Sequence, residues 1–114
     1  MNIQQFVEII NVTLLAGGAP ENRAIATGYC CDLLSRVMAE APKDCAWMTV
    51  LTHTNIIAVA ELAGIGAIVV PSGIAVPQPT LEKAEQEKIP VISTELGSYE
   101  ISWRLHEALQ EELS

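Results

Sequence analysis

The sequence predicts an α/β fold of three layers, in which a mostly parallel sheet is flanked by helices on both faces. Two observations favour this fold class. Short apolar segments that suit strands alternate with helical segments of about ten residues, and this alternation is typical of right-handed βαβ units. The chain of 114 residues is also close to the usual size of one domain, so we expect residues 1–114 to form a single domain.

The first 30 residues predict one helix and two strands. Apolar residues from Ile3 to Ile10 recur at mixed spacings of three and four, which indicates a short amphipathic helix that ends before Asn11. A strand is expected over residues 12–15. Residues 17–22 are rich in glycine, proline and asparagine and predict a turn. A second strand is expected over residues 25–29.

The next predicted helix begins at Asp32, whose carboxylate is expected to cap it, and ends at Ala41 before a proline. One face of this helix is apolar and is predicted to be buried. That face consists of Leu34, Val37, Met38 and Ala41.

The middle of the chain predicts two buried strands joined by a helix. Residues 46–51 are nearly all apolar, which suits a strand covered on both faces. Thr54 or Asn55 is the expected cap of a helix over residues 56–63. Residues 67–70 follow a glycine-rich break and predict the central strand of the sheet.

The last third predicts a helix over residues 80–88, a strand over residues 91–93 and a final helix capped by Ser98. The final helix has apolar residues at every fourth position, which predicts a stripe that faces the core. The residues of that stripe are Ile101, Leu105, Leu109 and Leu113.

Composition and charge exclude several classes of function. The chain has 14 acidic and 6 basic residues and a net charge of −8, and six scattered cations supply no footprint for a phosphate backbone. We therefore expect no nucleic-acid partner. No apolar run is long enough to span a bilayer, and the first residues do not resemble a signal peptide. A cytoplasmic protein without membrane contact is the expectation.

The three cysteines do not indicate a disulfide framework, because their number is odd and Cys30 and Cys31 are adjacent. This usage suits a reducing compartment. Neither Cys45 nor His53 extends the adjacent pair to a known ligand spacing, so no metal site is predicted. The cysteines are expected to be small buried apolar side chains.

Ligands of open α/β sheets usually bind beyond the carboxyl ends of the strands, where helix N-termini converge. Polar residues in the connections that leave the predicted strands are therefore the candidate ligand-binding residues. They are Thr52, His53, Thr54, Asn55, Ser72, Gly73, Thr94 and Ser98. Helix caps and a plain turn explain the same residue types. For His53 two interpretations stay open, a proton shuttle and a partner for a backbone hydrogen bond.

The final helix has a second face that the core stripe does not explain. Tyr99, Trp103, His106 and Gln110 recur at spacings of four, three and four. Trp and Tyr are favoured at interfaces, so Tyr99, Trp103 and His106 are candidate contacts with another subunit. The alternative is a helix enclosed within its own domain.

Standard catalytic motifs are absent from the sequence. It contains no G-x-x-x-x-G-K-[ST] phosphate loop, no G-x-G-x-x-G after the first strand, no G-x-S-x-G and no H-E-x-x-H. No complete catalytic constellation and no cofactor are identified, which favours a noncatalytic protein.

Several short segments occur in an order that is typical of one known family. They are residues 47–50, 52–60, 67–73, 80–84, 89–94 and the closing helix, with residues 28–29 and 32–39 upstream. On these segments the sequence from Trp47 to Leu105 resembles the DRTGG domain, a small α/β module related to the N-terminal domain of HPr kinase/phosphorylase. The string that names the family does not occur, and Ser72-Gly73 stands where related sequences often have a Thr-Gly-Gly-like turn.

The resemblance implies a module that accompanies catalytic or sensory units without supplying catalytic residues. We therefore expect a regulatory or ligand-sensing module that forms a homodimer and binds a small metabolite or nucleotide at the strand ends. One alternative is an adaptor subunit that docks on a larger metabolic or redox enzyme complex. Another is a small enzyme that uses His53 as general base, with Thr52 or Ser72 orienting the substrate.

Overall fold

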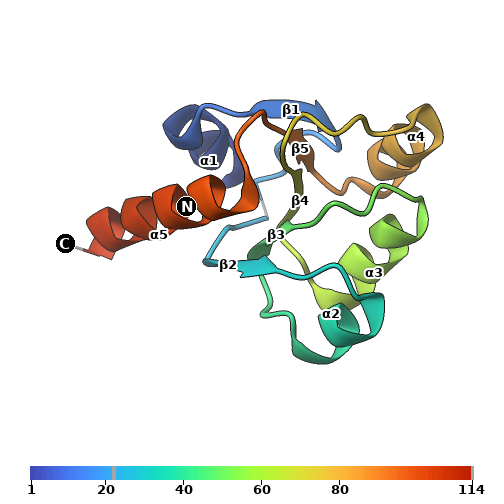
Figure 1. Cartoon of the computed structure of the whole chain (residues 1–114), viewed down its shortest axis with the longest axis horizontal. Helices are drawn as coiled ribbons and strands as arrows, with labels where there is room; N and C mark the ends of the chain where they lie inside the picture. The colour runs from blue at the N-terminus through green and yellow to red at the C-terminus, as the bar shows by residue number, and fades with distance from the viewer. Residues whose placement is uncertain (22, 114) are drawn as a thin grey trace.

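The computed structural model describes residues 1–21 and 23–113, which form one five-stranded sheet with helices on both faces (Figure 1). The strand order is β1-β5-β4-β3-β2. Strands β2 to β5 are parallel, and β1 is antiparallel to β5. The predicted mostly parallel sheet is therefore confirmed. The strands are β1 (Thr13–Ala16), β2 (Thr27–Cys30), β3 (Cys45–Met48), β4 (Ala67–Val70) and β5 (Val91–Ser93).

The helices divide into two outer layers, which confirms the three-layer prediction. In Figure 1, α1 and α5 lie to the left of the sheet and α2, α3 and α4 lie to the right. Each layer covers its own cluster of buried apolar side chains. The helices are α1 (Ile3–Ile10), α2 (Leu34–Glu40), α3 (Asn55–Ala63), α4 (Gln78–Glu87) and α5 (Ser98–Leu113).

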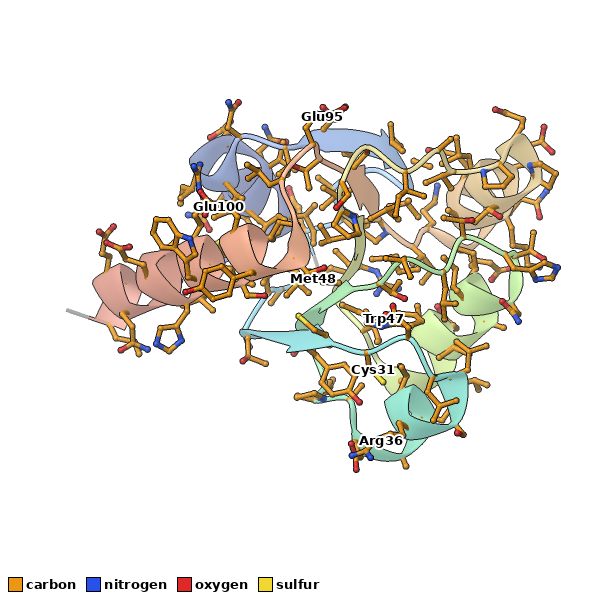
Figure 2. All side chains as sticks on the ribbon, viewed as in Figure 1. Cys31, Arg36, Trp47, Met48, Glu95 and Glu100 are labelled. Atoms are coloured by element: carbon orange, nitrogen blue, oxygen red, sulfur yellow. The ribbon has the colours of Figure 1, made fainter. Side chains whose placement is uncertain are left out.

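Consecutive residues of β3 show how the sheet separates the two cores. Met48 belongs to the core under α1 and α5, and Trp47 belongs to the core under α2, α3 and α4. Figure 2 shows the two side chains on either side of the strand. The buried indole Nε1 of Trp47 donates to the carbonyl oxygen of Cys31 at 2.8 Å, so the largest core side chain also has its polar atom satisfied.

The observed boundaries differ from the predicted ones by a few residues. The helix before Asn11 is confirmed, and Asn11 ends it in the left-handed conformation. The strand predicted over residues 46–51 ends at Met48: the amide of Thr49 still donates to the carbonyl oxygen of Val69 in β4, but the amide of Val50 donates to the Asp32 carboxylate. Lys88, predicted as the last helical residue, is instead the left-handed cap that follows α4. The predicted turn at residues 17–22 includes Asn22, which lies outside the described residues.

The buried apolar stripes predicted for α2 and α5 are partly wrong. On α2, Val37 is buried but Met38 is 45% exposed. On α5, Ile101, Leu105 and Ala108 are the buried residues, and Leu113 is 81% exposed. Positions four apart drift around a helix of 3.6 residues per turn, so a long run of them leaves the buried face.

Gly17 joins β1 to the following loop where no side chain fits. Its φ is +82°, and a Cβ atom there would lie 1.9 Å from the carbonyl oxygen of Ile89. Its amide donates to the Glu85 carboxylate at 2.7 Å. The close approach of two backbones at this point requires glycine.

Candidate ligand-binding site

The predicted ligand-binding residues lie in the connections that leave β3, β4 and β5. Because β2 to β5 are parallel, their carboxyl ends meet at one edge of the sheet, which we call the carboxyl edge. Residues 52–55 follow β3, Ser72 and Gly73 follow β4, and Thr94 and Ser98 follow β5. The parallel arrangement therefore brings segments that are distant in sequence to the same side of the molecule.

Asp32 lies at the carboxyl edge but does not cap α2, which corrects the prediction. Its Oδ1 atom accepts the Thr49 hydroxyl at 2.8 Å and the amide of Val50 at 2.9 Å. The cap position of α2 is occupied by Leu33, which makes no side-chain cap bond. Asp32 is thus one residue too early to reach the first amides of the helix, and it ties the end of β2 to the end of β3 instead.

His53 performs the capping role that was predicted for Thr54 or Asn55. Its Nδ1 atom accepts the amide of Asn55 at 3.2 Å. Thr54 is the N-cap residue but makes no side-chain cap bond, because its backbone is helical (φ −55°, ψ −24°) rather than extended. One interpretation of His53, a partner for a backbone hydrogen bond, is therefore confirmed.

The first amides of α3 are already engaged by this connection. The amide of Ile56 donates to the carbonyl oxygen of His53, and the amide of Ile57 donates to that of Thr54, each at 3.1 Å. An anion at this helix terminus would have to displace these bonds. A base role for His53 would have to use Nε2, since Nδ1 has a donor.

Ser72 and Gly73 form a turn that is fixed to the segment after β5. Both have positive φ, and their amides donate to the carbonyl oxygens of Leu96 at 2.8 Å and Thr94 at 2.9 Å. A Cβ atom on Gly73 would lie 2.5 Å from Oε2 of Glu95, so the carboxylate covers the glycine. The turn therefore closes over the ends of β4 and β5, with its amides pointing into the protein.

Thr94 and Ser98 also make local hydrogen bonds. The Thr94 hydroxyl accepts the amide of Leu96 at 3.1 Å. Ser98 is the first residue of α5 and not its cap, which corrects the prediction: the amide of Ile101 donates to the carbonyl oxygen of Gly97 at 3.1 Å, so Gly97 holds the cap position. The carbonyl oxygen of Ser98 accepts the Ser102 hydroxyl at 2.6 Å. The amides that precede Ile101 in the first turn of α5 have no partner within the helix, so this terminus retains donors at the carboxyl edge.

Two surface hollows reach the predicted residues. The α3–α4 hollow, of about 450 Å³, is lined by Thr54, Asn55, Ala58, Pro79, Glu82, Lys83 and Gln86. A smaller hollow of about 270 Å³ includes Thr94 and Arg104. Sequence reasoning missed Lys83, whose ammonium lies 3.3 Å from Glu87. Its position on the polar face of a predicted helix gave no sign that this helix packs beside α3.

The adjacent cysteines point to opposite sides of the sheet. The Sγ atom of Cys30 lies 3.3 Å from the Ser102 hydroxyl of α5, whereas that of Cys31 contacts the carbonyl oxygen of Leu33 at 3.6 Å. Cys45 is buried, and burial raises the pKa of its thiol to about 11. Cys30 is exposed, which corrects its prediction as buried. Among the described residues, no three His, Cys, Asp or Glu side chains are grouped to hold a metal ion.

The predicted second face of α5 is exposed. Tyr99 is 84% and Trp103 43% exposed, and His106 is exposed as well. The Trp103 indole donates to Glu100 at 2.6 Å, and the guanidinium of Arg104 lies 5.7 Å from its ring centroid. Hydrogen bonds from Trp103 and Arg104 lower the pKa of the Glu100 carboxyl. Trp103 is therefore already engaged by neighbours on its own helix.

Comparisons with known proteins agree with this architecture. A family model described as the DRTGG domain matches residues 5–108. No curated protein matches the chain. A solved structure of the CBS and DRTGG domains of the regulatory region of Clostridium perfringens pyrophosphatase, complexed with the activator diadenosine tetraphosphate, is similar, with a TM-score of 0.70 at 13% identity. The similarity covers 91% of this chain and 45% of that one. No helix among the described residues is long and apolar enough to cross a membrane.

Proposed function

The chain belongs to the DRTGG domain family, and on this premise we propose that it is a noncatalytic regulatory module that binds a small metabolite or nucleotide and self-associates. The observation that carries the proposal is the match of the family over most of the chain, together with a fold shared with a regulatory region whose structure holds a nucleotide activator. At 13% identity the shared fold does not transfer the ligand, so the ligand class is part of the proposal. The missing catalytic motifs favour sensing over turnover.

The proposed ligand site is the carboxyl edge, and the proposed contacts are Thr52, His53, Thr54, Asn55, Ser72, Gly73, Thr94 and Ser98. Within this edge the α3–α4 hollow is the best supported position. Its volume of about 450 Å³ falls within the usual range for small-molecule sites. Asn55 offers an amide for a base or a hydroxyl group, and Lys83 offers a cation for a phosphate.

Nuclear magnetic resonance titration tests this site directly. Diadenosine tetraphosphate and ATP would be added separately to the ¹⁵N-labelled chain, and amide shifts would be mapped. We expect the largest shifts around Asn55 and Lys83, and at least tenfold weaker binding in Asn55→Ala and Lys83→Met. Lys43→Met removes the same charge outside the lining of this hollow and should bind normally. Shifts confined to other surfaces would refute the site.

A wider search for the ligand uses native mass spectrometry of the protein purified from its own cells. A retained small molecule with the mass of a nucleotide or metabolite would support the proposed function. A bare chain that also gives no shifts with either nucleotide would contradict the proposed nucleotide ligand.

An adaptor subunit of a larger metabolic or redox enzyme complex is the second candidate function. The observation that favours it is the exposure of Tyr99 and Trp103 on one helix, since such side chains are frequent anchors at interfaces. In the same spectrum, a complex with a larger enzyme would favour the adaptor over the sensor. Turnover that is lost in His53→Ala would instead indicate the small enzyme.

A further inference from the structure

Helix α5 carries a second stripe beside the one that it buries. Tyr99, Ser102, His106, Leu109 and Leu113 follow one another at spacings of three, four, three and four, which is the spacing of residues along a helix-packing seam. The stripe contains no acidic residue. Tyr99 at its start is 84% exposed, and Leu113 at its end is 81% exposed.

The opposite flank of α5, which is the side next to α1, carries charged residues. The hollow between α1 and α5 is lined there by Arg104, Glu107 and Glu111, with Trp103 and Ile9 beside them. Helix α5 thus separates a charged flank next to α1 from an uncharged flank. In a chain with a net charge of −8, an uncharged flank is where two copies would repel each other least.

The uncharged flank of α5 lies beside β2, the outermost strand on one side of the sheet. Strand β2 is last in the strand order, and its residues Thr27, Gly28, Tyr29 and Cys30 are uncharged. Ser102, His106 and Leu109 line a hollow of about 260 Å³ together with these four residues. The helix stripe and the strand edge therefore form one continuous surface.

The free side of β2 offers backbone hydrogen bonds. The amide of Cys31 donates to the carbonyl oxygen of Met48 at 3.3 Å, and β2 pairs with β3 in one unbroken register, so the alternation of a strand directs the amides of Gly28 and Cys30 away from β3. Exposed edges are usually protected by lysine, proline or a bulge. The four residues of β2 have neither lysine nor proline, and β2 pairs with β3 without a register shift.

We propose that this surface binds a second copy of the chain, an inference that rests on the proposed self-association. The two β2 strands pair antiparallel about a twofold axis, and the two α5 stripes pack against each other across the same axis. An antiparallel strand pair is self-complementary under such an axis. A basic partner would instead be attracted to the charged flank, which carries Glu107 and Glu111. The uncharged flank therefore suits a second copy of the chain.

Charge insertion and sedimentation equilibrium test the surface. We expect the wild-type chain to form a species of twice the 12.3 kDa chain mass. His106→Glu places like charges near the axis, and Leu113→Glu places a charge at the end of the packed stripe; each should raise the dimer dissociation constant at least tenfold. Leu62→Glu, at a leucine that is 75% exposed on α3, is the matched control and should leave the dimer intact. Circular dichroism would show that each variant is folded.

Amide hydrogen exchange reports on the strand pairing separately. In the dimer, the amides of Gly28 and Cys30 should exchange at least tenfold more slowly than in the dissociated Leu113→Glu variant. Fast exchange at both amides in the dimer would overturn the proposed pairing.

The outcomes separate this inference from the proposed function. A dimer that dissociates with Trp103→Glu but resists both His106→Glu and Leu113→Glu uses the charged flank, which overturns the inference and leaves self-association in place. A wild-type chain that is monomeric at all concentrations overturns both, without bearing on ligand binding.

Discussion

Replacing Thr49 by valine tests the connection between β2 and β3 at the carboxyl edge. Thr49 is 1% exposed, and its hydroxyl donates to Asp32 at 2.8 Å and accepts the amide of Leu51 at 3.2 Å. Valine has nearly the same shape but neither bond. The substitution therefore removes two hydrogen bonds from a site that leaves little room for water.

The expected cost follows from these two bonds. A hydrogen bond to a charged group contributes about 1.5 to 3 kcal/mol, and a neutral one about 1 kcal/mol. Asp32 is exposed and can be solvated after the change, so the lower values apply. We expect Thr49→Val to lower the free energy of unfolding by about 2 to 3 kcal/mol, a large part of the roughly 5 to 15 kcal/mol of a small domain.

Urea unfolding followed by circular dichroism measures this cost, and a double-mutant cycle with Asp32→Ala assigns it. If Asp32 binds Thr49, the double variant loses their shared bond once, and the coupling energy should be at least about 1 kcal/mol. The cycle of Asp32→Ala with Thr80→Val is the control. The Thr80 hydroxyl donates to the carbonyl oxygen of Thr52 at 2.7 Å, so its effect should add to that of Asp32→Ala.

Two results would refute this reasoning. A cost below about 0.5 kcal/mol for Thr49→Val would mean that the hydroxyl bonds do not stabilise the fold. Additive effects of Thr49→Val and Asp32→Ala would mean that the two side chains share no stabilising bond.

Three further predictions concern glycine and cysteine. Gly17→Ala should lower the melting temperature far more than Gly18→Ala. Both glycines have positive φ, so alanine is strained at either position. Only at Gly17 would the added Cβ atom also collide with the backbone of Ile89, because a Cβ atom at Gly18 has nothing within 4 Å. In the folded protein at pH 8, a maleimide should label exposed Cys30 quickly and buried Cys45 only after unfolding; equal labelling rates would contradict the burial. Burial raises the pKa of Cys45 from 9.0 to about 11, so the unfolded chain loses that proton first and stability should fall as pH rises from 9 to 11, with a smaller decrease in Cys45→Ala.

Local patterns were sufficient to predict the elements. The apolar run at residues 67–70 became β4 with the predicted bounds, and the strand at residues 91–93 became β5. The helix that ends before Asn11 was also correct. Each of these depends on the spacing of apolar residues within one segment and on the residue that stops it, and both are visible in the sequence.

The polar residues of the carboxyl edge show what local sequence patterns do not predict, which is the partner of each side chain. Asp32 and Thr54 are common cap residues, and both precede helices, but neither side chain caps one. Asp32 binds the end of β3, which is a neighbour of β2 only in the folded sheet. His53 takes the capping role because Thr54 is already helical. Each outcome depends on which atoms folding brings within reach.

The sequence by itself determined the fold class, because the order of strands and helices and the right-handed crossover leave few ways to build a covered parallel sheet. It also determined the net charge of −8 and the apolar periodicity of the last helix. Only the tertiary structure decided which stripe of α5 is buried and which adjoins the free edge of β2. Two stripes of one helix can both suit packing, and the neighbours that occupy one of them come from distant parts of the chain.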